Sequence, residues 1–401
     1  MKRKEADLTD NPSTFKSVRK ILVIKLRHIG DVLLSAPAMR ALKESFPDAK
    51  VSVLINSGTE ESLSGNPAID ELIIFDRSIK KLPLVNRIAK EIAFLRKIRA
   101  KGFDMAVDLT NGDRAVILSY FSGARYRLAA DPGKKGFAGK RYLYTHLANI
   151  DKQKHMVFQN LDVVKQFGID AKNEDVDFFI PEEAKAFVKK IFKENSIEDT
   201  DKVVHIHPTS RWLWKCWKDE YMAEIIGWLI EKGIKVIVTS APDGREMEKA
   251  KRILSLISDY RTQNTEHRQN NSELMHISGD SPSRSIGMGQ SPLRVLDLAG
   301  KTTIKQLAAI SEASDLFVGV DSAPMHIAAA VGTPVVALFG PTLENLWAPY
   351  SRGHIVISKD MPCKPCKKGS CEGVELRECM KAIKQEDVKK AVSKLLRTHN
   401  C

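Results

Sequence analysis

Short apolar runs without alternation recur along the chain, and they constrain its fold more than any other feature. They occupy residues 21–26, 51–55, 71–76 and 104–109 in the first half, and 203–207, 235–240, 295–300, 315–320 and 334–340 in the second. Strands that are apolar on both faces are typical of sheets covered by helices on both sides, and such sheets are parallel. The sequence therefore predicts an α/β protein with two doubly wound sheets.

Amphipathic stretches between these runs predict helices over residues 30–46, 84–100, 113–121 and 386–396. Residues 174–183, which include Pro181, are expected to lead from one half to the other. The predicted organisation is a charged, mobile start (1–20), a first domain (21–178), a crossing (179–202), a second domain (203–385) and a closing helix (386–401).

Two segments of the second half do not fit this pattern. Residues 260–294 are rich in Asn, Gln, Ser and Gly without periodicity, which predicts a flexible surface insertion. Residues 363–379 begin with CxxC and carry four cysteines: Cys363, Cys366, Cys371 and Cys379. Four thiols at this spacing suit a structural zinc site or a pair of disulfides, and both alternatives stay open. We assign the segment no catalytic role.

The chain of 401 residues has a formal net charge of +13, which points to anionic partners. These could be nucleotide phosphates, nucleic acid or an acidic membrane surface, but no motif for reading nucleic acid is present. No apolar run approaches the roughly 20 residues that span a bilayer, and the start is polar rather than signal-like. We therefore expect a cytoplasmic protein.

The helix predicted over 84–100 combines an apolar stripe with many basic residues. The stripe recurs at helical spacing and comprises Leu84, Ile88, Ile92, Leu95 and Ile98. The basic flank comprises Lys80, Lys81, Arg87, Lys90, Arg96, Lys97, Arg99 and Lys101. Such a face either packs its apolar stripe on the sheet, leaving a solvated basic rim, or lies on a membrane surface.

The turn GVDSAPMH, from Gly319 to His326, directly follows a buried strand. Pro324 suits the first turn of a helix, and AAAVG supplies the helix body and its glycine stop. Backbone N–H groups at Ser322 and Ala323, helped by the helix dipole, could hold a diphosphate. The alternative is that Asp321 and Ser322 only cap the helix.

Two further segments follow the first strand of each half. HPTSRWLWKCW (residues 207–217) offers hydroxyls and cations that suit an anionic leaving group, at Thr209, Ser210, Arg211 and Lys215. Its three tryptophans would pack on a base, on a sugar or on each other. RHIGDVLLSAPA (residues 27–38) places Asp31 in a first helical turn, where it could accept a proton or simply stabilise the helix dipole. This loop has neither GxGxxG nor GxxxxGK[ST].

With these three segments in this order, the sequence resembles glycosyltransferase family 9, the bacterial lipopolysaccharide heptosyltransferases. The combination of RHIGDVLL, NPAID, DLTNGDR and HPTSRWLWKCW resembles the heptosyltransferase III subgroup most. The resemblance implies a GT-B fold, in which two facing Rossmann-like domains form a cleft with the active site. It also implies an inverting transfer of heptose from ADP-heptose to a hydroxyl of the lipopolysaccharide inner core, without a metal cofactor. The remaining alternative is a nucleotide-sugar-binding protein of the same fold that uses another sugar or lacks transferase activity.

The resemblance also implies roles for individual residues. Asp31 matches the general base, Lys215 the lysine on the donor phosphates, and Thr209 and Ser210 the paired hydroxyl residues. Asp321 matches the aspartate that contacts the sugar, while Ser322, Ala323 and His326 fall in the diphosphate turn. The acidic residue on the ribose is either Asp243 or Glu246.

Acceptor recognition is expected in the first half, at basic residues on the loops: Arg27, Lys134, Lys135, Lys140 and Arg141. The implied partners are a nucleotide-sugar donor and a lipopolysaccharide core at the inner membrane surface. We expect a monomer, either free in the cytoplasm or held peripherally on the cytoplasmic face of that membrane.

Overall fold

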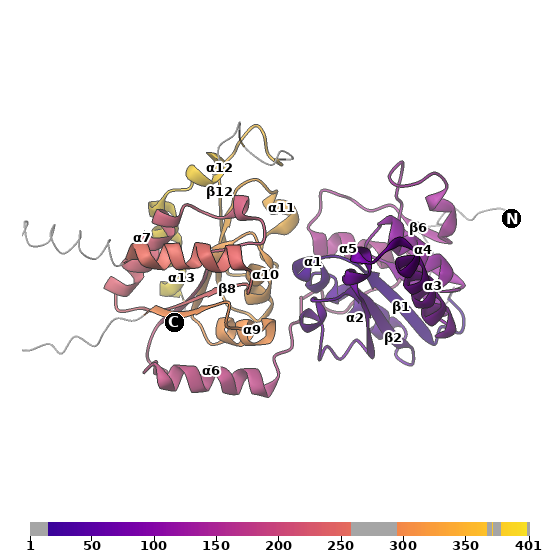
Figure 1. Cartoon of the computed structure of the whole chain (residues 1–401), viewed down its shortest axis with the longest axis horizontal. Helices are drawn as coiled ribbons and strands as arrows, with labels where there is room; N and C mark the ends of the chain where they lie inside the picture. The colour runs from indigo at the N-terminus through magenta and orange to yellow at the C-terminus, as the bar shows by residue number, and fades with distance from the viewer. Residues whose placement is uncertain (1–14, 258–294, 367–370, 372–377, 399–401) are drawn as a thin grey trace, which may run out of the picture. The chain divides into compact units, whose positions relative to one another are not determined.

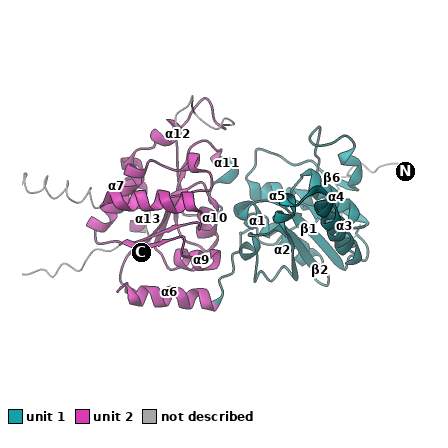
Figure 2. Ribbon diagram, in the orientation of Figure 1, with its two compact units in different colours: residues 1–181, 345–351 teal, residues 182–344, 352–401 magenta. Residues whose placement is uncertain are grey.

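The computed structural model describes residues 15–257, 295–366, 371 and 378–398 (Figure 1). The insertion predicted over 260–294 therefore lies outside the described residues. The chain divides into two compact units (Figure 2). The first unit comprises residues 1–181 and 345–351, and the second comprises 182–344 and 352–401.

The first unit is built on a six-stranded parallel sheet in the order β3-β2-β1-β4-β5-β6. Its strands are β1 (Lys20–Lys25), β2 (Lys50–Asn56), β3 (Glu71–Phe75), β4 (Met105–Asp108), β5 (Tyr126–Ala130) and β6 (His146–Ala148). The first four are the predicted apolar runs. The sequence did not predict β5 and β6, because these strands are short and Arg127 and His146 interrupt their apolar residues.

Helices and 3-10 turns connect these strands. The helices are α1 (Ile29–Leu33), α2 (Ala36–Ser45), α3 (Leu84–Ala100), α4 (Asp113–Phe121) and α5 (Met156–Lys165), and the turns are η2 (Glu60–Ser62), η3 (Arg77–Lys81) and η4 (Lys140–Leu143). The prediction of one helix over 30–46 is wrong, because Leu34 and Ser35 interrupt the helix and separate α1 from α2. Pro37 lies in the first turn of α2, where its missing N–H leaves no bond unmade.

The prediction of a mobile start over residues 1–20 is wrong for the residues described from 15 onward. Phe15 is buried and makes edge-on ring contacts with Phe46, Tyr126 and Phe167. β1 begins at Lys20, whose backbone N–H donates to the Asp104 carboxylate at 2.9 Å. This segment is therefore part of the core of the first unit.

The second unit has its own six-stranded parallel sheet in the order β12-β11-β10-β7-β8-β9. Its strands are β7 (Val203–His207), β8 (Lys235–Ser240), β9 (Val295–Ala299), β10 (Leu316–Val320), β11 (Val335–Phe339) and β12 (Ile355–Ser358). Only β12 was not predicted. Gly319 in β10 pairs with His207, and a Cβ there would lie 2.7 Å from the Phe317 ring, so the position accepts no side chain.

The helices of this unit begin in the stretch that was predicted as a crossing. α6 (Glu182–Glu194) buries Ala184, Val188 and Ile191 along one face and contacts α9 (Ile304–Glu312). The others are α7 (Asp219–Glu231), a helix over 244–257, α10 (Ala323–Ala330), α12 (Glu378–Lys381) and α13 (Gln385–Thr398), with the turn η5 (Leu213–Lys215). At α11 (Glu344–Trp347) the chain returns to the first unit for residues 345–351.

Counted within each unit, both sheets have the strand order 3-2-1-4-5-6, which is that of the Rossmann fold. The prediction of two doubly wound parallel sheets is confirmed. In this topology, ligands bind where the strand order reverses, beyond the carboxyl ends of the first and fourth strands. These positions are the segments after β1 and β4 and the segments after β7 and β10. Among the described residues, we find no helix whose length and hydropathy would let it traverse a bilayer.

Candidate functional site

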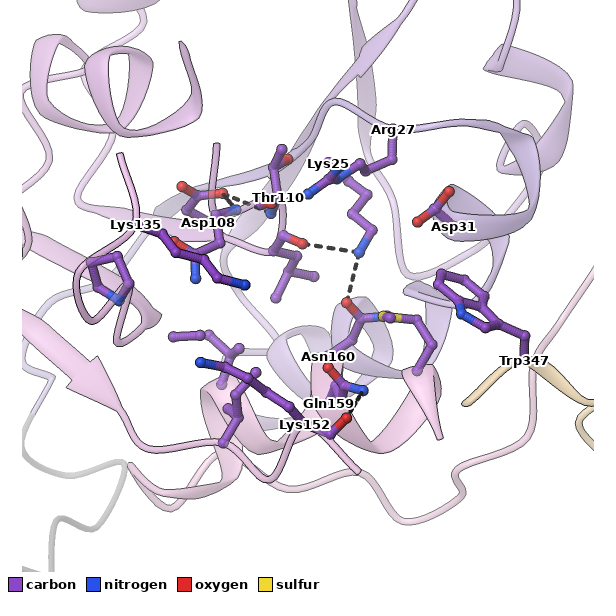
Figure 3. A pocket seen from close by; sticks show the side chains of 17 residues that line it. Lys25, Arg27, Asp31, Asp108, Thr110, Lys135, Lys152, Gln159, Asn160 and Trp347 are labelled. Atoms are coloured by element: carbon purple, nitrogen blue, oxygen red, sulfur yellow. Dashed lines mark hydrogen bonds between the residues drawn. The ribbon is translucent and has the colours of Figure 1, made fainter. Parts of the chain in front are cut away.

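A pocket of about 340 Å³ lies in the first unit, beyond the carboxyl ends of β1 and β4 (Figure 3). Its polar lining brings together residues from loops and helices that are distant in sequence: Lys25, Arg27, Asp31, Asp108, Thr110, Asn111, Lys135, Lys152, Gln159 and Asn160. Trp347, from the segment that returns to this unit, also lines it. The pocket therefore combines several cations with two carboxyl groups.

Lys25 ends β1 and is almost fully buried beneath the pocket. Its ammonium donates to the backbone carbonyl of Leu109 at 2.9 Å and to Asn160 Oδ1 at 2.8 Å, as Figure 3 shows. Burial lowers the pKa of Lys25 to about 8, against the opposing effect of the charge on Asp31. Asn160 in turn donates to the carbonyl of Leu34 at 3.0 Å. Lys25 thus ties together three chain segments around the pocket.

Asp31 lies in the first turn of α1 and is half-buried. No donor among the described residues forms a hydrogen bond with its carboxylate, although the group lines a pocket rich in cations. A carboxylate with open acceptor positions, facing space for a ligand, has the chemistry of a proton acceptor.

Asp108, the second carboxyl group of the pocket, is fully engaged. It accepts hydrogen bonds from the backbone N–H of Thr110 at 2.7 Å, from that of Asn111 at 3.0 Å, and from the Tyr144 hydroxyl at 2.5 Å. Burial raises the pKa of Asp108, opposed by these hydrogen bonds. Asp108 therefore stabilises the turn after β4.

The basic residues that the sequence predicted for acceptor binding separate into two sets. Arg27 and Lys135 line the pocket, and Lys152, which the sequence did not single out, joins them. Lys140, in contrast, is buried and donates to the carbonyl of Asn111 at 2.9 Å, so it supports the turn. Lys134 and Arg141 are exposed and do not line the pocket.

In the second unit the central feature is the carboxylate of Asp321, which follows β10 and is buried. Its Oδ2 accepts from the Lys215 ammonium at 2.6 Å and from the Thr342 hydroxyl at 2.6 Å. The pair of Lys215 and Asp321 is only slightly exposed, so water screens it little. The structure therefore brings together two predicted residues that are 106 positions apart.

The start of α10 presents donors for which the described residues supply no acceptor. Ser322 occupies the N-cap position, but its side chain makes no capping bond, and its buried Oγ has no hydrogen-bond partner among the described residues. The Asp321 carboxylate is bonded elsewhere, so the alternative in which Asp321 and Ser322 cap the helix is wrong. Pro324 lies in the first turn as predicted, and Ala323 begins the helix with its backbone N–H available.

Glu246 and Asp243 have different environments, although the sequence did not distinguish them. Glu246 is buried and accepts from the Thr209 hydroxyl at 2.8 Å. Burial raises the pKa of Glu246. Asp243 is exposed and accepts from the backbone N–H of Arg245 at 3.1 Å, at the start of the helix over 244–257.

Behind Thr209 a chain of buried polar groups runs along one face of the sheet. His207 contacts Thr209 Oγ1 at 3.4 Å and Thr239 Oγ1 at 2.9 Å, and His205 contacts the same Thr239 oxygen at 2.7 Å and Ser311 Oγ at 2.9 Å. Burial lowers the pKa of His207 to about 3, so its ring is neutral. The chain fixes the orientation of Thr209, and through it of Glu246.

The rest of the segment after β7 is divided between core and surface. Trp217 is buried and donates to the carbonyl of Ile383 at 3.1 Å. Trp212 is exposed, with its ring centroid 6.2 Å from that of Trp214 and the Arg211 guanidinium 5.7 Å from its ring. Ser210 Oγ accepts from the backbone N–H of Trp212 at 3.3 Å. His326 is buried within α10.

The cysteine segment shows neither of its predicted structures in the described residues. No disulfide joins the described cysteines Cys363, Cys366, Cys371 and Cys379, so the structure does not bear out the alternative of a pair of disulfides. Within the described ranges, no group of three or more His, Cys, Asp or Glu side chains is placed to hold a metal ion.

Several site residues were missed because their role depends on partners distant in sequence. Lys25 and Asn160 meet only in the folded sheet, and Thr342 reaches Asp321 from the turn after β11. The available signals were a lysine inside an otherwise apolar strand and an asparagine inside an apolar helix. A buried polar residue requires a partner, which marks such positions as structurally or functionally committed.

Solved structures share this architecture. A glycosyltransferase family 9 protein from Veillonella parvula superposes with a TM-score of 0.73 at 23% identity, covering 95% of this chain and 97% of its own. Escherichia coli ADP-heptose lps heptosyltransferase II gives 0.70 at 20% identity, covering 95% and 100%. An Escherichia coli heptosyltransferase with ADP-2-deoxy-2-fluoro heptose gives 0.65 at 19% identity, covering 94% and 99%. The fold is therefore that of the GT-B glycosyltransferases.

Sequence comparison gives the particular family. Residues 92–263 and 285–375 match glycosyltransferase family 9 (heptosyltransferase). Lipopolysaccharide heptosyltransferase 3 of Escherichia coli is 30% identical over 330 residues, covering 82% of this chain and 86% of its own length. The chain belongs to glycosyltransferase family 9. The resemblance seen in the sequence is confirmed, and the protein is a glycosyltransferase.

Proposed function

We propose that this enzyme transfers heptose from ADP-heptose to a hydroxyl of the lipopolysaccharide core, with inversion at the anomeric carbon. The family and the named activity of its relatives support this donor and this acceptor. The observation that carries the mechanism is the carboxylate of Asp31, which lines a pocket and has no hydrogen-bond donor among the described residues.

Asp31 is the proposed general base. The acceptor oxygen attacks the anomeric carbon and forms the new C–O bond, while the bond between that carbon and the β-phosphate oxygen breaks. The hydroxyl proton passes to Asp31, and ADP leaves with the electron pair of the broken bond. A single displacement of this kind inverts the anomeric configuration. Asp108 is less suited to this role, because it already accepts three hydrogen bonds.

The start of α10 is the proposed diphosphate site. The backbone N–H groups of Ser322 and Ala323 point outward from the helix start, and Ser322 Oγ adds a donor that has no acceptor in the described part of the chain. Lys215 supplies positive charge for the departing ADP, because it needs only shift partially from Asp321 towards a phosphate oxygen. Asp321 then contacts hydroxyls of the transferred sugar.

Glu246 is the proposed partner of the ribose hydroxyls, in preference to Asp243. Thr209 and the buried histidines behind it hold the Glu246 carboxyl in one orientation. Asp243 is exposed to solvent, and its carboxylate already accepts a hydrogen bond from the backbone N–H of Arg245 in the helix that follows. A fixed carboxylate discriminates between sugar hydroxyl patterns better than a mobile one, because it has no orientational freedom to lose.

The first-unit pocket is the proposed acceptor site. Arg27, Lys135 and Lys152 give it positive charge for the anionic groups of a lipopolysaccharide core. We place the reaction at the cytoplasmic side of the inner membrane, where a monomer of this enzyme would meet the lipid-anchored acceptor.

The direct test is to incubate the protein with ADP-heptose and a series of lipopolysaccharide cores truncated after successive sugars, with mass detection of products. We expect one member of the series to gain a single heptose while ADP is released in equal amount. The proposal fails if ADP-heptose binds in calorimetry and yet no member of the series gains mass. That result would favour a binding protein of this fold.

A further inference from the structure

Exposed apolar side chains are distributed unequally over the molecule. Among the described residues, all the large hydrophobic side chains that are strongly exposed lie in the first unit, except Trp212. They come from α3, α4 and the segment around η4: Leu84, Val85, Ile88, Ile92, Ile117, Tyr120, Phe121, Phe137 and Tyr142. α4 contacts both α3 and η4, so these residues belong to one contiguous part of the unit.

The first half of α3 carries an apolar stripe that is largely exposed. Leu84, Val85, Ile88 and Ile92 are 68%, 78%, 49% and 43% exposed. Their spacing in a helix places them within about a third of its circumference. We call these four residues the α3 stripe.

The second half of α3 packs on the sheet. Ile98 is the one residue of the helix that is buried, and Phe94 and Leu95 pack against the same core cluster from partly buried positions. Leu84, Ile88 and Ile92 do not belong to this cluster, so for them the alternative of packing on the sheet is wrong. Hydrophobic side chains left exposed together on one helix face indicate a surface that is covered in use.

Positive charge surrounds the α3 stripe. Lys80 and Lys81 at the end of η3, together with Lys90, Arg96 and Lys97 on α3, are exposed. None of these five forms an ion pair with a carboxylate in the described parts of the chain, whereas Arg87 is paired with Glu91. The unpaired cations attract an anionic surface and repel a second copy of the same face.

The neighbouring α4 adds aromatic residues of the kind found at lipid headgroups. Tyr120 and Phe121 are 46% and 49% exposed, with ring centroids 5.6 Å apart. Exposed aliphatic and aromatic groups flanked by Lys and Arg are the composition of helices that lie in the membrane interface.

We propose that the α3 stripe and its basic flank form the surface by which this enzyme docks on a bilayer containing anionic phospholipid. The apolar side chains enter the headgroup boundary, and the cations contact lipid phosphates. The attraction of this surface to a bilayer does not depend on catalysis. The biological role of docking rests on the proposed function, because docking would hold the enzyme where its lipid-anchored acceptor lies.

The test is sedimentation with vesicles of phosphatidylcholine alone and of phosphatidylcholine mixed with phosphatidylglycerol in equal parts. We expect binding to the mixed vesicles. The V85S/I88S double variant should bind on the order of 10-fold more weakly, because each lost apolar group removes buried area. Neutralising the flank in the K80Q/K81Q/K90Q variant should weaken binding by about 5-fold per charge.

The matched control for charge is K189Q/K193Q, since both lysines are exposed on α6 in the second unit. This variant should bind the mixed vesicles like the wild type. Circular dichroism and thermal unfolding of every variant distinguish lost docking from lost folding. Equal binding by the wild type and V85S/I88S would overturn the proposal, and so would a wild-type dimer that this substitution dissociates.

A separate assay keeps this proposal distinct from the proposed function. With a core oligosaccharide freed of its lipid, V85S/I88S should transfer heptose at the wild-type rate. A wild type that transfers to that soluble acceptor, yet ignores anionic vesicles, would retain the proposed function and refute the docking surface.

Discussion

Two aspartates that follow central strands, one in each unit, differ in their surroundings. Asp31 lines a pocket, and no described group hydrogen-bonds its carboxylate. Asp321 is buried and is held by Lys215 and Thr342, each at 2.6 Å. The same side chain can therefore serve opposite tasks on the same topology. An unengaged carboxylate can take a proton, whereas one with two short donors is fixed in place and remains an acceptor.

The largest effect should come from removing the open carboxylate. In D31N the amide has nearly the same shape but cannot take up the acceptor proton, so kcat should fall by on the order of 100-fold or more. Affinity for ADP, measured by calorimetry, should not change, because the donor groups lie in the second unit. Transfer by D31N at close to the wild-type rate would show that Asp31 is not the general base. The proposed difference in role between Asp31 and Asp321 would then be wrong.

The buried lysine beneath the Asp31 pocket should appear in the pH dependence of stability. Lys25 has a pKa of about 8 in the folded protein, below its unfolded value of 10.5. Between these values the unfolded chain binds more protons, so this group makes stability rise with pH. Below pH 8 both states are protonated, and the cost of the buried charge is constant.

Denaturant unfolding across this range would measure the effect. The free energy of unfolding of the wild type relative to K25M should rise by on the order of 3 kcal/mol from below pH 8 to above pH 10.5. A difference that stays flat with pH would show that Lys25 titrates normally. Methionine is the matched replacement because it keeps most of the volume of the aliphatic chain.

Breaking the pair around Asp321 should affect stability and donor binding together. Of the donors that the described residues supply, K215M leaves the buried Asp321 carboxylate only Thr342, which should cost about 2 kcal/mol of unfolding free energy. Affinity for ADP should fall by roughly 10-fold, since a charge-assisted bond to phosphate is lost. The double variant K215M/D321N should recover part of the stability and none of the affinity. Recovery of both would mean that the pair is purely structural.

The smallest effect concerns Ser322. Because its Oγ has no partner within the described ranges, S322A should change stability by less than about 0.5 kcal/mol while weakening ADP binding by about 5-fold. S314A is the matched control, because Ser314 Oγ donates to the carbonyl of Ile310 at 2.7 Å. That variant should lose about 1 kcal/mol of stability and no ADP affinity. The reverse pattern would show that Ser322 has no role at the donor site.

The sequence predicted those parts of the fold and site that depend on local pattern. The buried strands and the bounds of α3 follow from apolar runs and periodicity, and Asp31, Lys215 and Asp321 lie in short motifs after strands. Short strands such as β5, β6 and β12 left too little pattern. Helical periodicity identified the apolar residues of α3 but not which of them pack, because that depends on the orientation of the helix on the sheet.

Choices among neighbouring residues also required the structure. Glu246 and Asp243 differ only in what the fold places beside them, and Thr209 is the deciding neighbour. Lys140 was predicted to bind the acceptor along with the other basic residues of its loop. Instead, its ammonium donates a hydrogen bond to the carbonyl of Asn111 in the turn after β4. Charge and spacing do not reveal such long-range hydrogen bonds, because each requires two segments to meet.

The return of residues 345–351 to the first unit affects how the protein can be dissected. His155 Nε2 lies 3.0 Å from the carbonyl of Ala348, its ring stacks on Tyr350, and Trp347 lines the pocket. A fragment ending at Pro181 would therefore lack one wall of its own binding site. The halves cannot be produced as independent modules by a single cut in the gene. A split-protein or domain-exchange design must carry this heptapeptide with the first unit, for example by appending it through a short linker.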